Sequence, residues 1–270
     1  MTTSTTTTTK TSLIELVKKS DMVAVKNLLD CGLDTININE IDCDGSNVTA
    51  LYYACEIGNV EMVKLLLSIS SIDPNAAGEY GDTPLVVACE KKSNLNIIKL
   101  LLAHPNIDIN KRVIYGGVYT PLYTACDQGN LAIVRLLMSQ PGIDVNMNCG
   151  EDDGDVDVAL HAACSQGFSK IVTALLAHPS IDVNVQDTYG RTPFYMACND
   201  NHTKVVELLL ARDDVDVNLA NKYGKTPYQI VKDNHDYSLT CILPGAKSKW
   251  EKLCRQTLAL LTGNQRINTC

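Results

Sequence analysis

Apolar residues recur along this chain of 270 residues in pairs of short segments that are separated by polar breaks. In one such pair, the segment ALYYAC at residues 50–55 is followed by Gly58-Asn59 and then by a second apolar segment. That second segment, residues 60–67, carries its apolar side chains at helical spacing. The pattern predicts two short helices joined by a tight polar turn.

The helix pair is repeated along the chain. The segments TALYYAC, TPLVVAC, TPLYTAC, VALHAAC, TPFYMAC and TPYQIVK begin at Thr49, Thr83, Thr120, Val158, Thr192 and Thr226. Successive starts are 34, 37, 38, 34 and 34 residues apart. A period between about 20 and 50 residues indicates a repeat architecture in which each unit stacks on its neighbours.

Most units share the same local signals. Thr-Pro opens the first helix, because proline in the first turn loses no hydrogen bond there and has its φ preset. After the second helix, a loop leads into an Ile-Asp-Val-Asn segment or a close variant of it. A turn sequence such as Asp187-Thr188-Tyr189-Gly190 then leads back to the next Thr-Pro.

This pattern resembles the ankyrin repeat, whose signature runs through TPLH, an Ala pair, Gly-Asn or Gly-His, a Val-x-x-Leu-Leu helix and a Val-Asn before the hairpin. The resemblance covers about residues 11–263 and recurs five times in full. It implies an all-α ankyrin-repeat solenoid of stacked helix-turn-helix units with β-hairpin loops, and we expect seven helix pairs. It also implies that His161, at the TPLH histidine position, ties the hairpin to its own repeat by hydrogen bonding.

The repeat pattern sets the expected domain boundaries. Residues 1–10 (MTTSTTTTTK) are predicted to be a disordered Thr-rich tail. The ankyrin-repeat domain is expected at 11–263, with an amino-terminal cap at 11–47, full repeats at about 48–225 and a carboxy-terminal cap at 226–263. Residues 264–270 form a second tail. Leu65, Leu136, Leu175 and Leu208, all on second helices, are predicted to be buried between repeats.

Composition narrows the class of partner. The chain is 45% hydrophobic and 20% charged, as in an ordinary globular protein, and its net charge is −8. An acidic chain is a poor ligand for nucleic acid or an anionic membrane, because both require a basic surface. No apolar run approaches the roughly 18 residues of a membrane span.

Without a visible signal peptide, eleven cysteines indicate free thiols, so we expect a cytoplasmic monomer, with the nucleus as an alternative location.

Five of the cysteines follow an alanine at the same repeat position: Cys55, Cys89, Cys126, Cys164 and Cys198. Adjacent helix pairs lie roughly 8–10 Å apart, whereas a disulfide needs Cα atoms within about 7 Å. Zinc sites usually draw on closely spaced cysteine pairs, and the chain has no CxxC. We therefore predict that these cysteines pack as small hydrophobic residues, and that Cys43 and Cys149, in hairpins, are more reactive.

Candidate catalytic and metal sites are weak in this sequence. His104 and His178 stand in similar Ala-His-Pro loops, but they are two repeats apart and cannot share a ligand. A calcium loop beginning at Asp153 would require glycine at 158 and glutamate at 164, where Val158 and Cys164 stand. We find no phosphate-binding or nucleophile motif, and we predict a protein that is not an enzyme and has no cofactor.

Binding residues are implied by the resemblance. Ankyrin contacts come from hairpin residues beside the turn glycine and from the two positions after the Ala pair. With the acidic insertion of the fourth hairpin, the candidate residues are Tyr80, Asp82, Tyr115, Tyr119, Asp127, Gln128, Asp152, Asp153, Asp155, Tyr189, Arg191 and Tyr223. The tyrosines are either partner contacts or hairpin packing residues. The insertion is either a solvated loop or a docking point for a basic partner segment.

Two functions remain as hypotheses. The first is a non-enzymatic protein–protein interaction scaffold or adaptor that binds a partner protein on the concave ankyrin surface. The second is a substrate-receptor subunit of a ubiquitin ligase, because residues 250–258 look like the elongin-binding helix of suppressor-of-cytokine-signalling boxes. Trp250 stands where those boxes have leucine, and no Leu-Pro-rich segment follows. A simple capping helix is the other interpretation of this segment.

Overall fold

The computed structural model describes residues 12–31, 36–42, 48–78, 81–90, 95–112, 119–149 and 157–233. In these residues the chain forms thirteen α-helices and no β-strand, and an isolated antiparallel bridge joins Ile41 to Thr49. The chain divides into two compact units, residues 1–159 and 160–270.

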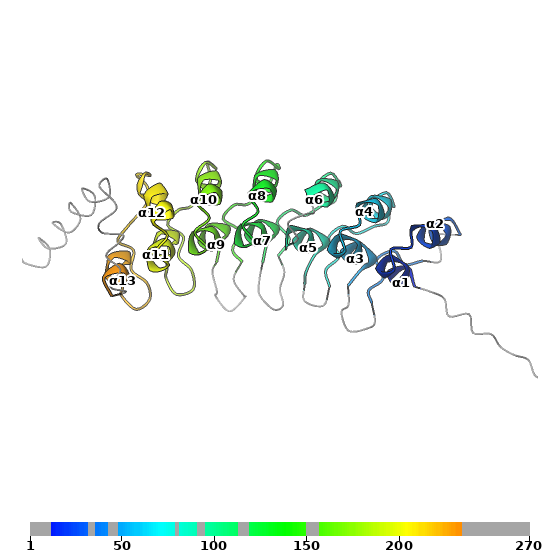
Figure 1. Ribbon diagram of the computed structural model, residues 1–270, viewed down its shortest axis with the longest axis horizontal. Helices are drawn as coiled ribbons and strands as arrows, with labels where there is room; N and C mark the ends of the chain where they lie inside the picture. Colours follow the sequence, from blue (N-terminus) through cyan, green and yellow to red (C-terminus); the bar gives the residue numbers. More distant parts are fainter. Residues whose placement is uncertain are drawn as a thin grey trace, which may run out of the picture. The chain divides into compact units, whose positions relative to one another are not determined.

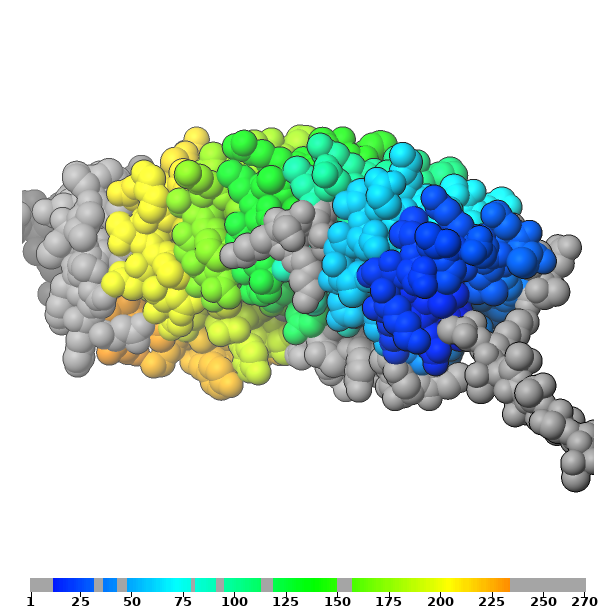
Figure 2. Space-filling view, turned by 45° about the vertical axis from the view of Figure 1, so that its right-hand side comes forward, coloured from blue at the N-terminus to red at the C-terminus, as the bar shows by residue number. Residues whose placement is uncertain are grey.

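The first unit contains four helix pairs. Its helices are α1 (Leu13–Lys18), α2 (Met22–Asp30), α3 (Ala50–Glu56), α4 (Val60–Leu67), α5 (Pro84–Glu90), α6 (Leu95–Leu102), α7 (Pro121–Asp127) and α8 (Leu131–Met138). The odd-numbered helices pack on one another in sequence, and α4, α6 and α8 form a second row (Figure 1). Figure 2 shows the side chains of α1 and α2 (dark blue) beside those of α3 and α4 (lighter blue).

The second unit contains α9 (Ala159–Ser165, which begins at the boundary), α10 (Ser169–Leu176), α11 (Pro193–Asn199), α12 (Thr203–Leu210) and α13 (Pro227–Asp233). Here α11 packs on both α12 and α13, and α10 packs on α12. The stacked helix pairs confirm the predicted fold class. Of the seven expected pairs, six are present. The seventh is represented by α13, because its second helix would lie outside the described residues.

Threonine caps explain where the first helices begin. The hydroxyl oxygens of Thr49, Thr120 and Thr192 accept hydrogen bonds from the backbone N–H three residues later, at 3.3, 3.1 and 3.1 Å. Each bond satisfies an N–H group that has no partner within the helix. Pro121 and Pro193 follow in the first helical turn, where no N–H is needed.

The turn between the paired helices uses the Gly-Asn sequence. Gly58 and Gly129 have φ values of 76° and 71°, a left-handed conformation that strains other residues. Asn59 and Asn130 then cap the second helices, and their side-chain oxygens accept from the backbone N–H three residues later at 3.1 and 3.3 Å. The polar breaks in the sequence therefore mark the helix junctions.

The second helices are buried in a different register from the one predicted. The leucines that are fully buried at equivalent positions are Leu66, Leu101, Leu137, Leu175 and Leu209. The prediction is confirmed for Leu175 but wrong for Leu65, Leu136 and Leu208, which are partly exposed. These three stand one residue before the buried position, which is a rotation of about 100° around the helix.

Candidate functional site

In each unit, the described hairpin segments lie on the side of the odd-numbered helices (Figure 1). We call this side the hairpin face. It comprises the odd-numbered helices with their terminal residues, Tyr119, and the described hairpin segments 36–42, 76–78, 81–83, 147–149, 185–192 and 219–226. The sequence-based candidate residues that are described lie on this face in one unit or the other.

The hairpin at residues 185–191 is built around Asp187. Its Oδ1 accepts hydrogen bonds from the backbone N–H of Tyr189 at 2.9 Å and of Arg191 at 2.7 Å. The backbone N–H of Asp187 donates to the carbonyl oxygen of Arg191 at 2.9 Å, and Gly190 has a φ of 74°. A buried side chain that accepts two backbone N–H groups fixes the turn, as the Asp-Thr-Tyr-Gly sequence predicts.

The next hairpin repeats this geometry with a neutral residue. Asn221 occupies the place of Asp187, and its Oδ1 accepts from the backbone N–H of Tyr223 and of Lys225, both at 3.0 Å. Its Nδ2 donates to the hydroxyl of Tyr195 on α11 at 3.0 Å. This hydrogen bond therefore anchors the hairpin to α11.

The two hairpins are also bonded to each other. The backbone N–H of Lys222 donates to the carbonyl oxygen of Tyr189 at 2.8 Å. The side chain of Gln186 donates to the carbonyl oxygens of Gly190 at 2.7 Å and of Ala220 at 3.1 Å. These bonds hold two successive hairpins in a fixed relation.

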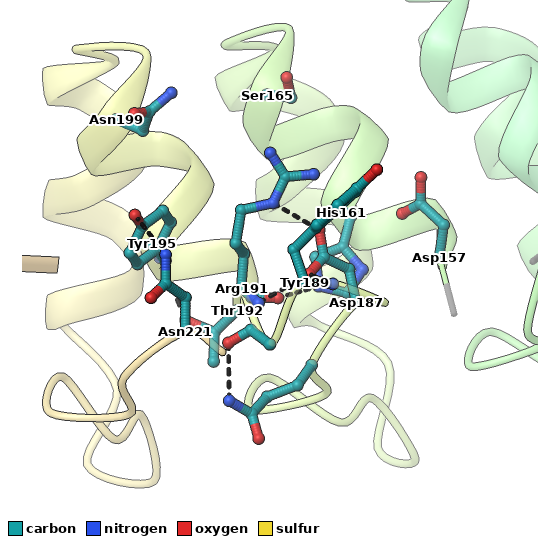
Figure 3. Close-up of polar contacts among 12 residues, drawn as sticks. Asp157, His161, Ser165, Asp187, Tyr189, Arg191, Thr192, Tyr195, Asn199 and Asn221 are labelled. Atoms are coloured by element: carbon teal, nitrogen blue, oxygen red, sulfur yellow. Dashed lines mark hydrogen bonds and ion pairs between the residues drawn. The ribbon is translucent and has the colours of Figure 1, made fainter. Parts of the chain in front are cut away.

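His161 confirms the role that the resemblance implies. Its Nε2 lies 3.1 Å from the carbonyl oxygens of both Val185 and Arg191 (Figure 3). Because both neighbours are acceptors, Nε2 carries the proton and donates to them. Tyrosine does the same at the equivalent position of another repeat, since the Tyr123 hydroxyl donates to Asp157 Oδ2 at 2.9 Å. The alignment of TPLY with VALH places Tyr123 at the position of His161.

Two predicted site residues, Tyr189 and Arg191, lie together in the second unit. The Arg191 guanidinium lies 4.9 Å from the centre of the Tyr189 ring, and its Nε donates to Asp187 Oδ2 at 2.6 Å (Figure 3). The carboxylate and the ring hold the arginine in one orientation. Tyr189 remains 52% exposed, so the pair is ordered but accessible. Asp187, which orders it, was not among the predicted site residues.

In the first unit, Tyr119 stands 40% exposed against Tyr123, with ring centres 5.4 Å apart. Burial raises the pKa of Tyr123, and the negative charges of Asp157 and Asp127 raise it further. The hydroxyl therefore stays protonated and keeps donating to Asp157. The Tyr119 ring therefore packs against the ring of Tyr123, while part of its side chain stays exposed to solvent.

Asp82 is half-buried, and burial raises its pKa. Its charge in turn adds to the effect of burial in raising the pKa of Tyr52, and Glu56 and Glu90 act in the same direction. The hairpin face of the first unit is therefore negative around Tyr52. The negative charge of this surface agrees with the net charge of −8 of the whole chain.

Asp127 and Gln128 end α7 on the hairpin face. Gln128 is the C-cap residue, and its Nε2 donates to Asp127 Oδ2 at 3.3 Å. Both side chains are partly exposed, as expected for the two positions after the Ala pair.

The remaining predicted site residues are distributed as follows. Tyr223, in the second unit, is 75% exposed. Tyr80, Tyr115, Asp152, Asp153 and Asp155 lie outside the described residues. Residues 250–258, on which the ubiquitin-ligase hypothesis depends, also lie outside them.

The cysteines after alanine are packing residues. All five are free thiols and are buried, at most 2% exposed, which confirms their predicted environment. The prediction for Cys149 is wrong. Its thiol is buried 3.4 Å from the Thr120 hydroxyl oxygen, and burial raises its pKa to about 11. A buried, protonated thiol is a poor nucleophile. Cys43 lies outside the described residues.

His104 and His178 both serve their own loops. The Nδ1 atom of each accepts a hydrogen bond from the backbone N–H two residues later, at 3.3 Å. Within the described ranges, no group of three or more His, Cys, Asp and Glu side chains is placed to hold a metal ion. Nor does any described helix have the length and hydrophobicity needed to cross a membrane.

Stacked helix pairs with hairpin loops define a helical repeat protein of the solenoid class. Sequence profiles of the ankyrin family match it: "Ankyrin repeats (3 copies)" at residues 11–113 and 160–243, and "Ankyrin repeat" at residues 119–147. The chain belongs to the ankyrin-repeat family.

Curated relatives match over part of the chain. The ankyrin repeat and KH domain-containing protein mask of Drosophila melanogaster is 32% identical over 108 residues, which are 39% of this chain and 2% of that protein. The human SMC5-SMC6 complex localization factor protein 1 is 33% identical over 120 residues, 44% of this chain and 11% of that protein. The similarity therefore concerns the repeats and a small part of each relative.

Solved structures show the same fold. The ankyrin repeat domain of Bcl-3 has a TM-score of 0.69 and 22% identity, and the match covers 83% of this chain and 97% of that one. The human ASB11 ankyrin repeat domain has a TM-score of 0.63 and 20% identity, with 81% and 90% covered. At this level of identity the likeness concerns the fold alone.

Proposed function

We propose that the protein is a non-enzymatic scaffold or adaptor that binds a partner protein on the hairpin face, the surface expected from the sequence to be concave. Ankyrin repeats are protein–protein interaction modules, so the class of function follows from the family. The finer assignment rests on where the exposed apolar side chains lie.

In each unit, most of the exposed large apolar residues lie on the hairpin face. Those in the described part of the chain are Ile41, Ile57, Tyr119, Tyr189, Tyr223 and Tyr228, with Val23 on α2 as the exception. Exposed apolar and aromatic side chains that recur on one face are typical of an interaction surface. The outward positions of the second helices instead carry charged residues such as Lys64, Lys99, Arg135, Lys170 and Lys204.

The test begins with affinity capture of the full chain from cell extract, which identifies the partner. Binding titrations then compare Tyr119→Ala and Tyr189→Ala with Lys64→Ala and Lys99→Ala. Each tyrosine variant should weaken binding by more than about 1 kcal/mol, because exposed tyrosines on a binding face act as anchors. The lysine variants should bind normally. Loss of binding from the lysines but not from the tyrosines would place the site on the second helices.

The location of the protein is part of the same proposal. The free thiols support a reducing compartment such as the cytoplasm. The net charge of −8 supports a monomer, because like-charged molecules repel one another. Imaging of the tagged chain and light scattering of the purified protein test this. An exclusively extracellular or membrane-bound signal would contradict it.

A further inference from the structure

The two hairpins of the second unit, residues 185–191 and 220–225, form a continuous rigid support, which we call the ledge. Asp187 and Asn221 each fix their own hairpin through two backbone N–H groups. The bond from the Lys222 N–H to the Tyr189 carbonyl oxygen joins one hairpin to the other. Side chains on the ledge are therefore displayed from an ordered backbone, which lowers the entropy cost of binding.

The charges on the ledge do not balance. In the first hairpin, Asp187 neutralises Arg191 across 2.6 Å. In the second, the equivalent residue is the neutral Asn221, and Lys225 pairs instead with Asp233 on α13 at 2.7 Å. This leaves Lys222, which is exposed and makes no ion pair with any described residue. A surplus positive charge thus lies on the ledge of a chain whose net charge is −8.

Two accessible tyrosines flank this cation. The backbone carbonyl oxygen of Tyr189 accepts a hydrogen bond from the Lys222 N–H, and Tyr223 is the next residue along the chain. Tyrosine offers a flat apolar ring and a hydroxyl, and it loses little conformational freedom when it is covered by a partner. The ledge therefore carries an exposed ammonium group without an ion-pair partner among the described residues, together with two exposed tyrosines.

We propose that the ledge binds an acidic segment of a partner protein, with a carboxylate against Lys222 and an apolar side chain against Tyr189 or Tyr223. This deepens the proposed function and rests on it. Nucleic acid suits the ledge less well. Polyanion binding depends on several phosphate contacts, and two of the three cations here already have carboxylate partners. The net charge of −8 also repels a long polyanion more strongly than a short acidic peptide.

The first experiment selects peptides from a random twelve-residue phage library on the full chain and, in parallel, on its Lys222→Glu variant. Peptides selected on the natural chain should be rich in Asp and Glu next to an aromatic residue or leucine. Selection on Lys222→Glu should lose this acidic preference, because the charge that attracts it has been reversed. The same peptides from both selections, or peptides without acidic preference, would overturn the proposal.

The second experiment measures the affinity of the most enriched peptide by fluorescence anisotropy. Lys222→Glu should weaken binding at least about tenfold, and Tyr223→Ala at least about fivefold, as expected of contacts at the centre of a site. The matched control is Lys170→Glu, an exposed lysine on α10 with the same change of charge, which should bind within a factor of about two. An equal loss in the control would show a general charge effect and overturn the site.

Three further outcomes bear on the ledge and on the proposed function. Peptides that depend on Tyr119 but not on Lys222 would overturn the ledge while leaving a protein-binding hairpin face. A library that yields no peptide bound to the hairpin face would count against both. Competition by single-stranded oligo(dT) stronger than by the peptide itself would assign the ledge to nucleic acid instead.

Discussion

The side chain of Asn75 is bonded to the backbone of Asp108 in the next repeat: the Asp108 N–H donates to Asn75 Oδ1 at 2.8 Å. The Asn75 Nδ2 completes the junction by donating to the carbonyl oxygen of Asn106 at 2.7 Å. The same pair of bonds to the following loop is made by Asn39, Asn110 and Asn184. At these four positions the asparagine before the hairpin therefore joins its repeat to the next.

Asn75→Ala should lower the free energy of unfolding of the first unit by about 1–3 kcal/mol, because it removes two hydrogen bonds at a junction. Asn218→Ala is the matched control. Asn218 has the same place after Asp216, is exposed, and its side chain makes no hydrogen bond to a described residue. Urea denaturation measures both. Equal losses would show that the bonds across the junction contribute little.

Leu137→Ala should cost about 2–5 kcal/mol, because Leu137 is fully buried between helices and its truncation leaves a cavity. Leu136→Ala should cost clearly less, since that side chain is partly exposed. The two variants differ by one position on α8 and have the same composition. Thermal or urea denaturation distinguishes them, and a greater loss in Leu136→Ala would mean that Leu136, not Leu137, packs in the core.

The sequence predicted the fold because each signal occurs several times. One Thr-Pro or Gly-Asn pair is weak, but successive copies at a near-constant period constrain helix starts and turns together. The register of the second helices could not be predicted in the same way. In α4, three leucines stand in a row at residues 65–67, and helical spacing fits more than one of them. Only the neighbouring helices decide that Leu66 is the buried one.

The candidate site was predictable in part. The sequence predicts that Tyr189 and Arg191 lie in one hairpin, because they stand on either side of the turn glycine Gly190. Cys149 was misjudged because a hairpin position was equated with exposure. The Cys149 N–H donates to the carbonyl oxygen of Asp157, and the Thr120 hydroxyl lies 3.4 Å from the buried thiol. The link between the two hairpins of the ledge depends on their spacing in three dimensions, which no local sequence signal carries.

Stability should fall at alkaline pH. Burial raises the pKa of the Cys55, Cys89, Cys164 and Cys198 thiols, and that of Cys149 to about 11. In the unfolded chain a thiol ionises near pH 8.5. Above this pH the unfolded chain loses thiol protons that the folded protein retains. The free energy of unfolding therefore has the full contribution of the buried thiols below about pH 8.5 and declines above it.

The decline should reach about 1.4 kcal/mol per pH unit for each buried thiol once the unfolded thiols are ionised. Urea denaturation at pH values from 8 to 10 measures the slope. Cys164→Ala should make the slope shallower, because one linked thiol is removed while the other titrating groups remain. An unchanged slope in this variant would show that the thiol is not protected from ionisation in the folded state.

Gly190→Ala and Gly224→Ala test the ledge as a structural element. Both glycines have a φ of 74°, so alanine at either position should cost about 1–2 kcal/mol in backbone strain. At Gly190 the added Cβ would also lie 2.8 Å from the backbone nitrogen of Lys222, whereas at Gly224 it would meet nothing within 4 Å. A backbone atom cannot rotate away as a side chain can, so the two hairpins must shift apart, which should weaken the hydrogen bond from the Lys222 N–H to the Tyr189 carbonyl oxygen. Gly190→Ala should therefore lose more stability in thermal denaturation and speed hydrogen exchange at the Lys222 amide, while Gly224→Ala leaves that amide protected. Equal protection of the Lys222 amide in both variants would mean that the hairpins are not rigidly joined.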